Sequence, residues 1–139
     1  MNGFPFSCGV EVRYRDVDAM NHVNNAVIVS YLEVARTRLW RENLGFRGSA
    51  ADFPFIVARI VVNYRSPIGL DDDVEVGIGV SGLGRTSFTF AYRVEASGRL
   101  ASEAESVQVT YDYGHRTTLP IPEDLRRRLA ALTLAHPRE

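Results

Sequence analysis

The order of apolar and polar residues in the first third of the chain predicts a strand followed by a long helix. Residues 9–15 alternate in part between apolar and polar, which is typical of a half-buried strand. From Ala26 onward the apolar side chains recur at helical spacing and form one face of a helix of about 19 residues. Asn24 or Asn25 can cap the start of this helix, which should end before Gly45.

After Pro54 the pattern changes to runs of β-branched and aromatic residues, which predict strands. Four strands are expected, over Phe55–Tyr64, Asp73–Ser81, Thr86–Ala96 and Leu100–Tyr113. Short turns that contain Gly or Pro separate them and favour antiparallel neighbours. Gly48 marks the connection before these strands, and Pro120 and Pro122 introduce a final helix over Glu123–Leu132. The order of elements indicates an α+β fold in one domain, residues 1–139, with the long helix covering one face of an antiparallel sheet.

Composition and charge narrow the possible functions. A formal net charge of -1 provides no broad basic field, so a nucleic-acid partner is not expected. All 16 basic residues are arginine, which excludes lysine Schiff-base chemistry and leaves arginine as the permanent cation for binding phosphate. Cys8 is the single cysteine and has no nucleophile motif around it. The sequence contains no candidate signal or membrane-spanning segment, so we expect a cytoplasmic protein with no membrane partner.

A polar segment between the first strand and the long helix carries the most specific pattern of the chain. It reads Tyr-Arg-Asp-Val-Asp-Ala-Met-Asn-His-Val-Asn-Asn over residues 14–25, and it resembles the D-x-D-x-x-G-H-V-N-N segment of 4-hydroxybenzoyl-CoA thioesterase-like proteins. Residues 30–36, 61–67, 85–88 and 109–112 are also similar to that family, so the resemblance spans roughly residues 8 to 130. The family is one of the hotdog-fold acyl-CoA thioesterases, in which an antiparallel sheet of about five strands wraps around one long helix.

The resemblance implies an acyl-CoA substrate, hydrolysed at a site that lies between two subunits. It therefore predicts a homo-oligomer, either a dimer or a tetramer of dimers, and it implies no metal or redox cofactor. The second Asp of the family segment is the catalytic carboxylate, and it falls on Asp18. Asp18 can activate water or attack the thioester directly, while backbone N–H groups at Asn24 and Asn25 stabilise the oxyanion. We expect burial beside the acyl chain to raise the pKa of Asp18.

Other residues of the segment leave more than one role open. His22 can orient Asp18, touch the substrate or fix the loop by hydrogen bonds. Asn21 stands where the family usually has Gly, and Asn tolerates the left-handed backbone conformation better than most residues. Ile28 stands where many relatives carry an aromatic residue that faces the acyl tunnel, so the acyl group is left open.

Coenzyme A carries a diphosphate and a 3′-phosphate, which arginine side chains and turn amides suit. The candidates are Arg59, Arg65, Arg85 and Arg116. Arg85 is the best of them because it follows Gly84 and is followed by Thr86 and Ser87, so that a turn there offers both hydroxyl donors and a cation.

Several alternatives compete with this interpretation. Asp16 and Asp18 can simply form a polar turn before the helix, and Asp16 is best explained as a structural partner of Arg13 or Arg15. A helix carboxylate is catalytic in another branch of the fold, but the spacing of Glu33 from Arg36 fits an ordinary ion pair. The Asp-Val-Asp run does not match a calcium loop, because Met20 occupies a ligand position. Two rival functions remain: a noncatalytic acyl-CoA binding module and a hotdog hydroxyacyl-thioester dehydratase.

Overall fold

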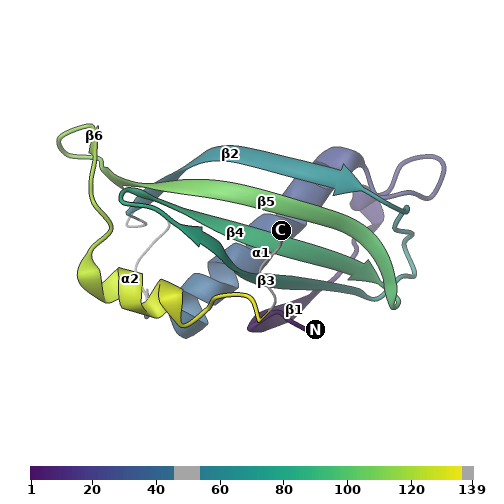
Figure 1. The fold of residues 1–139 in the computed structure, drawn as a ribbon. Coiled ribbons are helices and arrows are strands. Elements are labelled where there is room, and N and C mark those ends of the chain that lie inside the picture. The colour runs from purple at the N-terminus through teal and green to yellow at the C-terminus, as the bar shows by residue number, and fades with distance from the viewer. Residues whose placement is uncertain (46–53, 136–139) are drawn as a thin grey trace.

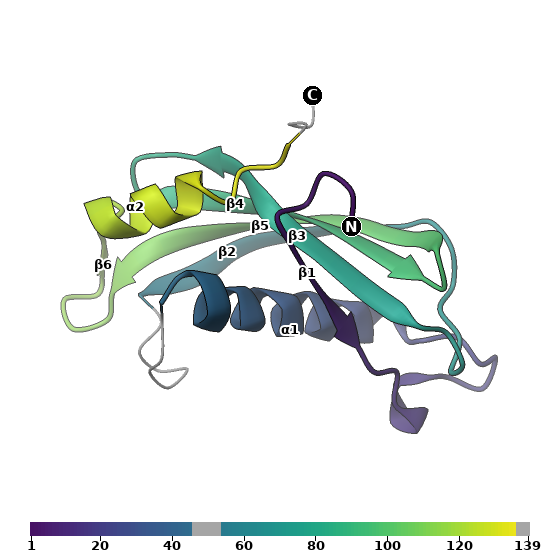
Figure 2. The ribbon, with the colours of Figure 1, turned by 90° about the horizontal axis from the view of Figure 1, so that it is seen from below.

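The computed structural model describes residues 1–45 and 54–135. A curved antiparallel sheet carries the long helix on one face and the short helix on the other (Figures 1 and 2). The elements are β1 (Phe6–Val10), a 3-10 turn at Tyr14–Asp16, α1 (Asn25–Asn43), β2 (Phe55–Tyr64), β3 (Val74–Leu83), β4 (Ser87–Ala96), β5 (Arg99–Asp112), β6 (Thr117–Thr118) and α2 (Glu123–Ala130). This arrangement confirms the predicted α+β hotdog fold.

The sheet has the strand order β1-β3-β4-β5-β2, and β6 pairs with the end of β5. Two strands, β1 and β2, therefore form its edges. Val10 pairs with Val74 at one end of the sheet, and Phe55 pairs with Thr110 at the other. The polar segment that follows β1 consequently lies at the end where β3 begins and β2 finishes.

Helix α1 forms because its apolar positions share one face and because both of its ends are capped. The side chain of Asn24 accepts a hydrogen bond from the backbone of Ala26, and Gly45 follows the helix with a φ of 70°. Leu32, Ala35 and Leu39 are fully buried against the sheet. These local signals explain why the predicted helix boundaries were confirmed.

Aromatic side chains fill the core between α1 and the sheet at the end where β2 begins. The ring of Trp40 stacks on Phe55 with a centroid distance of 4.9 Å, and Phe88 meets both rings edge-on. Burying such rings is among the largest favourable contributions to a core. The pair joins the C-terminal half of α1 to the beginning of β2.

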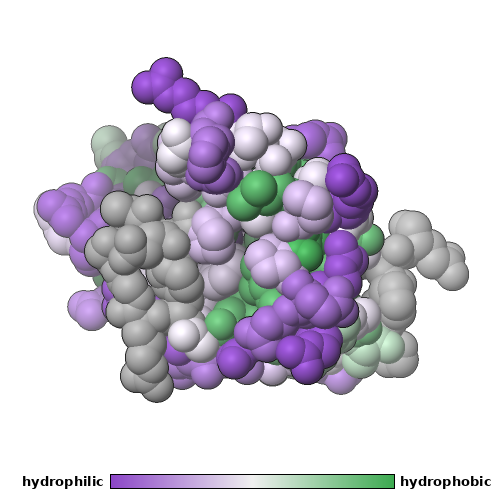
Figure 3. All heavy atoms as spheres, turned by 90° about the vertical axis from the view of Figure 1, so that its left-hand side faces the viewer, coloured by the Kyte–Doolittle hydropathy of each residue, from purple (hydrophilic) through white to green (hydrophobic). Residues whose placement is uncertain are grey.

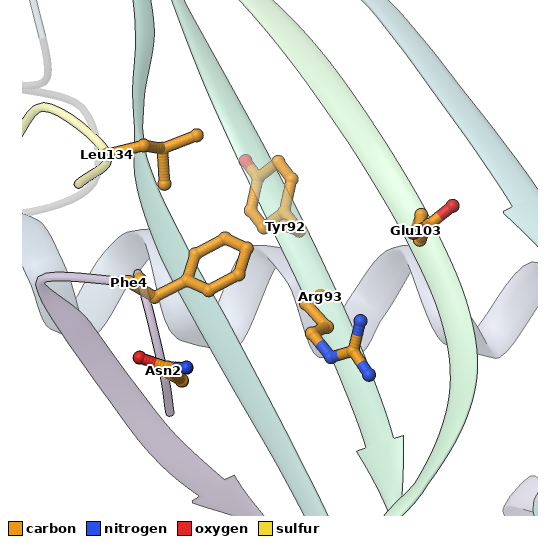
Figure 4. A pocket seen from close by; sticks show the side chains of 7 residues that line it. Asn2, Phe4, Tyr92, Arg93, Glu103 and Leu134 are labelled. Atoms are coloured by element: carbon orange, nitrogen blue, oxygen red, sulfur yellow. The ribbon is translucent and has the colours of Figure 1, made fainter. Parts of the chain in front are cut away.

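The other face of the sheet is covered near β3 by the two ends of the chain. A Cβ atom at Gly77 would lie 2.6 Å from the Met1 sulfur, and one at Gly79 would lie 2.6 Å from a methyl group of Leu134. A side chain at either position would have to displace side chains of the terminal segments, which approach the strand closely. A shallow pocket remains beside these segments, with Phe4 and Leu134 on one side and Arg93 and Glu103 on the other (Figure 4).

Two expectations about the strands were wrong in detail. Only Gly9 and Val10 of the strand predicted over residues 9–15 are in β1, which begins earlier at Phe6. The chain leaves the sheet because Asp16 donates its backbone N–H to the Arg13 carbonyl and accepts the Arg13 N–H on its side chain, which closes a turn. The short strand β6 was not predicted, since a two-residue strand has no detectable periodicity.

The remaining boundaries differ by a few residues. Strand β3 continues to Leu83, and α2 ends at Ala130 rather than at Leu132. The connection expected around Gly48 lies outside the described residues. Within the part of the chain that the structure describes, no helix is both long enough and apolar enough to cross a membrane.

Candidate active site

The loop between β1 and α1 is anchored by Asp16, a carboxylate that is 2% exposed. Its side chain accepts hydrogen bonds from the Tyr31 hydroxyl at 2.8 Å and the Arg13 backbone at 2.9 Å, and the Arg13 guanidinium lies 3.3 Å away. Burial acts to raise the pKa of Asp16, but these donors together hold it below its ordinary value. The structural role expected for Asp16 therefore fits its contacts.

Asp18 is exposed, and its two carboxylate oxygens differ in their surroundings. Oδ1 accepts hydrogen bonds from the backbone N–H groups of Met20 at 2.9 Å and His22 at 3.1 Å. Oδ2 has no hydrogen-bond partner among the described residues. The amides of His22 and Met20 hold the pKa of Asp18 below its ordinary value, so the expected upward shift by burial is wrong for the isolated subunit. One oxygen fixes the side chain, and the other faces outward as an ionised acceptor.

The backbone conformation explains why Asn21 can replace the Gly of the family pattern in the middle of the loop. Asn21 has a φ of 59°, in the left-handed region, as expected for a residue that replaces Gly. Its side-chain carbonyl accepts a hydrogen bond from the Leu70 backbone at 3.3 Å, and Val23 donates to the carbonyl of Ile68 at 2.7 Å. The loop is thus attached to the segment that connects β2 with β3.

That connecting segment is itself held by an ion pair that the sequence did not reveal. The guanidinium of Arg99 lies 2.9 Å from Asp72 and also donates to the carbonyl of Pro67 at 3.1 Å. Hydrogen bonds from Arg99 and from the Gly69 backbone lower the pKa of Asp72. The two partners are 27 residues apart, so no local pattern could have paired them.

The first turn of α1 supplies backbone N–H groups, but they are not equally available. The N–H of Asn24 donates to the carbonyl of Asp16 at 2.9 Å, and the N–H of Ala26 donates to the Asn24 side chain at 2.8 Å. The N–H of Asn25 has no acceptor among the described residues. The Tyr64 hydroxyl donates to the Asn25 carbonyl at 2.8 Å, which ties the helix start to the end of β2. Of the two expected oxyanion donors, Asn25 is the one that is open.

A pocket of about 270 Å³ opens between this helix start and the end of β2. Its lining residues come from the loop, α1, the end of β2, the connection from β2 to β3, and β5: His22, Val23, Asn25, Ile28, Tyr64, Arg65, Ser66, Pro67, Ile68 and Ser102. Asp18 lines a neighbouring depression together with Tyr14, Asn21 and Leu70. His22 and Asn25 therefore face one hollow of the isolated chain, and the carboxylate faces the next.

The predicted phosphate-binding residues do not gather at one place within the chain. Arg65 lines the pocket and pairs with Glu103 at 3.3 Å, so it lies at the same end as Asp18. Arg85 lies in the turn between β3 and β4, and Ser87 is the first residue of β4, both at the opposite end of the sheet. Within a single subunit these two residues lie far from Asp18, because β3 starts near the loop and runs away from it. Arg59 pairs with Val107 in the first half of β2.

Glu33 lies 3.9 Å from the guanidinium of Arg36, as its spacing predicted. The pair is not an ordinary surface pair, however, because the Arg36 side chain is buried and Glu33 is exposed. Glu33 belongs to the third turn of α1, away from the loop that carries Asp18. Glu33 therefore does not lie at the helix start, where the loop with Asp18 joins α1.

The sequence and the fold agree with known thioesterases. Residues 12–129 match the thioesterase-like superfamily. The acyl-CoA thioester hydrolase YbgC of Escherichia coli O157:H7 is 34% identical over 115 residues, covering 81% of this chain and 86% of that protein. The long-chain acyl-CoA thioesterase FadM of Escherichia coli K12 is 28% identical over 123 residues, covering 86% and 93%.

A crystal structure of a thioesterase from Thermus thermophilus, complexed with coenzyme A and Zn, superposes with a TM-score of 0.87. The two sequences are 41% identical, and the superposition covers 95% of this chain and 96% of the thioesterase chain. In residues 1–45 and 54–135 of this chain, no three His, Cys, Asp or Glu side chains cluster as metal ligands would. The match over most of the chain and the shared fold lead to one conclusion: the chain belongs to the thioesterase-like superfamily, has the hotdog fold and is a thioester hydrolase.

Proposed function

We propose that this enzyme hydrolyses acyl-CoA thioesters to the free acid and coenzyme A, with Asp18 as its catalytic carboxylate. The observation that carries the proposal is the contrast between the oxygens of Asp18. Two loop amides fix Oδ1, while Oδ2 is left open in the described chain, a few residues before a helix start with a free N–H. The acyl-CoA thioesterases to which the chain is similar support the same substrate class.

Two routes are open to Asp18, and each ends with the thiolate of coenzyme A as the leaving group. As a general base, Oδ2 takes a proton from water while the water oxygen attacks the carbonyl carbon, and the thiolate of coenzyme A then leaves. As a nucleophile, Oδ2 attacks the carbonyl itself and expels the thiolate, and water afterwards hydrolyses the mixed anhydride. Both routes build negative charge on the carbonyl oxygen.

The N–H of Asn25 is the proposed donor to that oxyanion. It lies at the positive end of the dipole of α1, which adds to its effect on a developing negative charge. A single donor of this kind is worth about 100- to 1,000-fold in rate. Asn24 is now proposed in a supporting role, since its N–H already serves the Asp16 carbonyl and its side chain caps the helix.

The edge strand β2 is the proposed surface for forming a dimer. It is 10 residues long, and Ile56, Val57 and Tyr64 are 37%, 38% and 45% exposed. A long apolar edge of this kind is a ready template for pairing with another strand. Antiparallel pairing of two β2 strands would bring the far end of the second copy, with its Arg85 and Ser87, to the same end of the dimer as Asp18.

That arrangement gives the separated candidates a common role. Arg65 of one subunit, and Arg85 and Ser87 of the second copy, are proposed to hold the phosphates of coenzyme A, with His22 near the thioester. Arg59 belongs to the same proposal as a weaker candidate. Assembly of dimers into a tetramer and a cytoplasmic location are also proposed, the latter in keeping with a single buried, unpaired Cys8.

The decisive experiment measures release of free thiol from a panel of short-chain, long-chain and aromatic acyl-CoA thioesters. Asp18→Asn is the test variant, because an amide oxygen can still accept from Met20 and His22 and so preserve the loop. We expect the variant to lose about 100- to 10,000-fold in kcat while it still binds acyl-CoA. Asp124→Asn on the exposed face of α2 is the matched control.

The two rival functions give different results in the same assay. A noncatalytic binding module would bind acyl-CoA but release no thiol in either wild type or variant. A dehydratase would change the absorbance of a hydroxyacyl thioester without releasing thiol. Either result would overturn hydrolysis as the function of this site.

A further inference from the structure

A second pocket lies between the C-terminal half of α1 and the beginning of β2, at the end of the sheet far from Asp18. Its walls are largely apolar, and its lining residues are Glu33, Arg36, Thr37, Trp40, Phe55, Ile56, Val57 and Tyr113. Figure 3 looks at this end of the molecule, where apolar side chains show in a hollow among polar ones. The pocket is neither part of the loop site nor used by the mechanism above.

Arg36 gives this pocket an unusual charge. The residue is only 7% exposed, yet its guanidinium has one neutral partner, the Tyr92 hydroxyl, at 3.1 Å. Tyr92 is in turn bonded to Ser106 at 2.6 Å, so this contact continues into a neutral network and not to a carboxylate. Buried charges are costly unless they are closely paired.

Glu33 is the one carboxylate paired with Arg36 among the described residues, and it neutralises the positive charge of Arg36 poorly. Its oxygen lies 3.9 Å from Arg36 Nη2, beyond the 2.7–2.9 Å typical of a charge-assisted hydrogen bond. The Glu33 side chain is 71% exposed, so water screens its charge. Among the described residues, the positive charge of Arg36 therefore has no closely bonded anion, and the guanidinium borders an open pocket.

We infer that this pocket binds a carboxylate through Arg36, and that in the enzyme proposed above it receives the far end of an acyl group carrying a second carboxylate. The inference rests on the proposed function for the identity of the acyl group, but not for the binding of a carboxylate. The apolar walls at Trp40, Phe55 and Val57 suit the methylene chain that precedes the charged end. The Thr37 hydroxyl lines the same pocket and can donate to the carboxylate.

The position of the pocket suits this role. Within one chain, Arg36 is 11 residues beyond Asn25, which is about 16 Å along the axis of α1. In an antiparallel β2–β2 dimer, the pocket of one subunit would lie beside the helix start of the other, because the Phe55 end of one strand then meets the Tyr64 end of its partner. The enzyme should therefore prefer dicarboxylic acyl groups of medium length.

Two matched thioesters test the preference: adipyl-CoA, which ends in a carboxylate, and hexanoyl-CoA, which does not. The measured quantity is the ratio of their kcat/KM values. Arg36→Gln should lower this ratio about 10- to 100-fold, the value of a hydrogen-bonded pair with a charged group. Glu33→Gln removes a repelling carboxylate from the pocket and should raise the ratio. Arg38→Gln is the control, since it removes a half-exposed arginine of the same helix that does not line the pocket, and it should leave the ratio unchanged.

Binding of free adipate to the same proteins, measured by calorimetry, provides a readout that does not require catalysis. We expect wild type to bind adipate, Arg36→Gln to lose that binding, and the neutral hexanamide, which has the chain but no carboxylate, to bind neither protein. If Arg36→Gln fails to fold, the exposed variant Glu33→Gln decides the matter, because its adipate affinity and its thioester ratio must both rise.

The outcomes separate the two proposals. Thiol release from both thioesters with a ratio that no variant changes, and no adipate binding, would overturn the inference and leave the hydrolase intact. Adipate binding that depends on Arg36, with no thiol released from either thioester, would sustain the carboxylate pocket and overturn the proposed function.

Discussion

The hydroxyl of Tyr31 donates a hydrogen bond of 2.8 Å to Asp16, and both groups are buried. Tyr31 belongs to the second turn of α1, whereas Asp16 precedes the loop that carries Asp18. The bond therefore joins the helix to the start of the loop, and the Asp16 carbonyl completes the connection by accepting the Asn24 N–H. The position of Asp18, the proposed catalytic carboxylate, depends on this buried pair.

Removing the donor should loosen the loop without touching Asp18. Tyr31→Phe leaves a buried carboxylate with one donor fewer, and we expect it to lower the free energy of unfolding by about 1–3 kcal/mol. The kcat should fall as well, because the loop loses an anchor. Urea unfolding and thiol release measure the two effects. Tyr111→Phe, on β5 at the other end of the sheet, is the control and should change neither quantity.

The pH dependence of stability follows from the same carboxylate. The pKa of Asp16 is lower in the folded protein, so its contribution to stability is fully present above the ordinary Asp pKa of about 4. That contribution is lost as the pH falls through the folded pKa. The pKa of Asp72 is lowered too, by its bonds with Arg99 and Gly69, and it acts in the same direction.

We therefore expect the unfolding midpoint in urea to be flat from neutral pH to about 5 and to drop below about 4. Asp16→Asn should be less stable at neutral pH and should show a smaller drop in acid. A midpoint that rises on acidification would contradict this assignment.

The Asp72–Arg99 pair should act on catalysis through the segment that supports the loop. Arg99→Gln breaks the contacts with both Asp72 and Pro67, and we expect a drop of about 0.5–2 kcal/mol in stability, the upper part of the range reflecting the partly buried Asp72. The kcat should fall while the KM for acyl-CoA changes little. Arg93→Gln, which breaks an ion pair elsewhere on the sheet, is the matched comparison. An equal fall of kcat in both variants would argue against a positioning role.

Asn21 allows a direct test of backbone strain in the loop. Both Asn21→Gly and Asn21→Ala lose the bond with the Leu70 amide, so their difference reports on the φ of 59°, set against the greater flexibility of glycine in the unfolded chain. Alanine should be less stable than glycine by about 1–2 kcal/mol, because its Cβ crowds the left-handed conformation. Thermal unfolding compares the pair, and equal stability would show that the loop relaxes to another conformation.

The proposed dimer can be tested at the edge strand. Val57→Lys places a charge on the exposed apolar part of β2, where it disfavours strand pairing. Sedimentation velocity should show a shift from dimer to monomer, and activity should fall with it. Thr117→Lys, on the exposed strand β6, is the control. A dimer that survives Val57→Lys unchanged would place the contact between subunits elsewhere.

Much of this protein was determined by local sequence patterns. Asn24, the helical apolar face and Gly45 fix the extent of α1, because capping and periodicity act over a few neighbouring residues. The left-handed backbone at Asn21 and the turn formed by Arg13 and Asp16 are of the same local kind, although the turn was not anticipated in the predicted strand. The alternating runs likewise located β2, β4 and β5 closely.

Tertiary structure decided which distant residues meet. It set Arg85 and Ser87 at the far end of the sheet from Asp18, and it occupied the Asn24 amide with the Asp16 carbonyl. It also made Arg36, whose spacing from Glu33 suggested an ordinary surface pair, a buried charge between α1 and the sheet. Periodicity defines the face of each element, but sheet order and helix placement determine what that face contacts, and these depend on the packing of the whole chain.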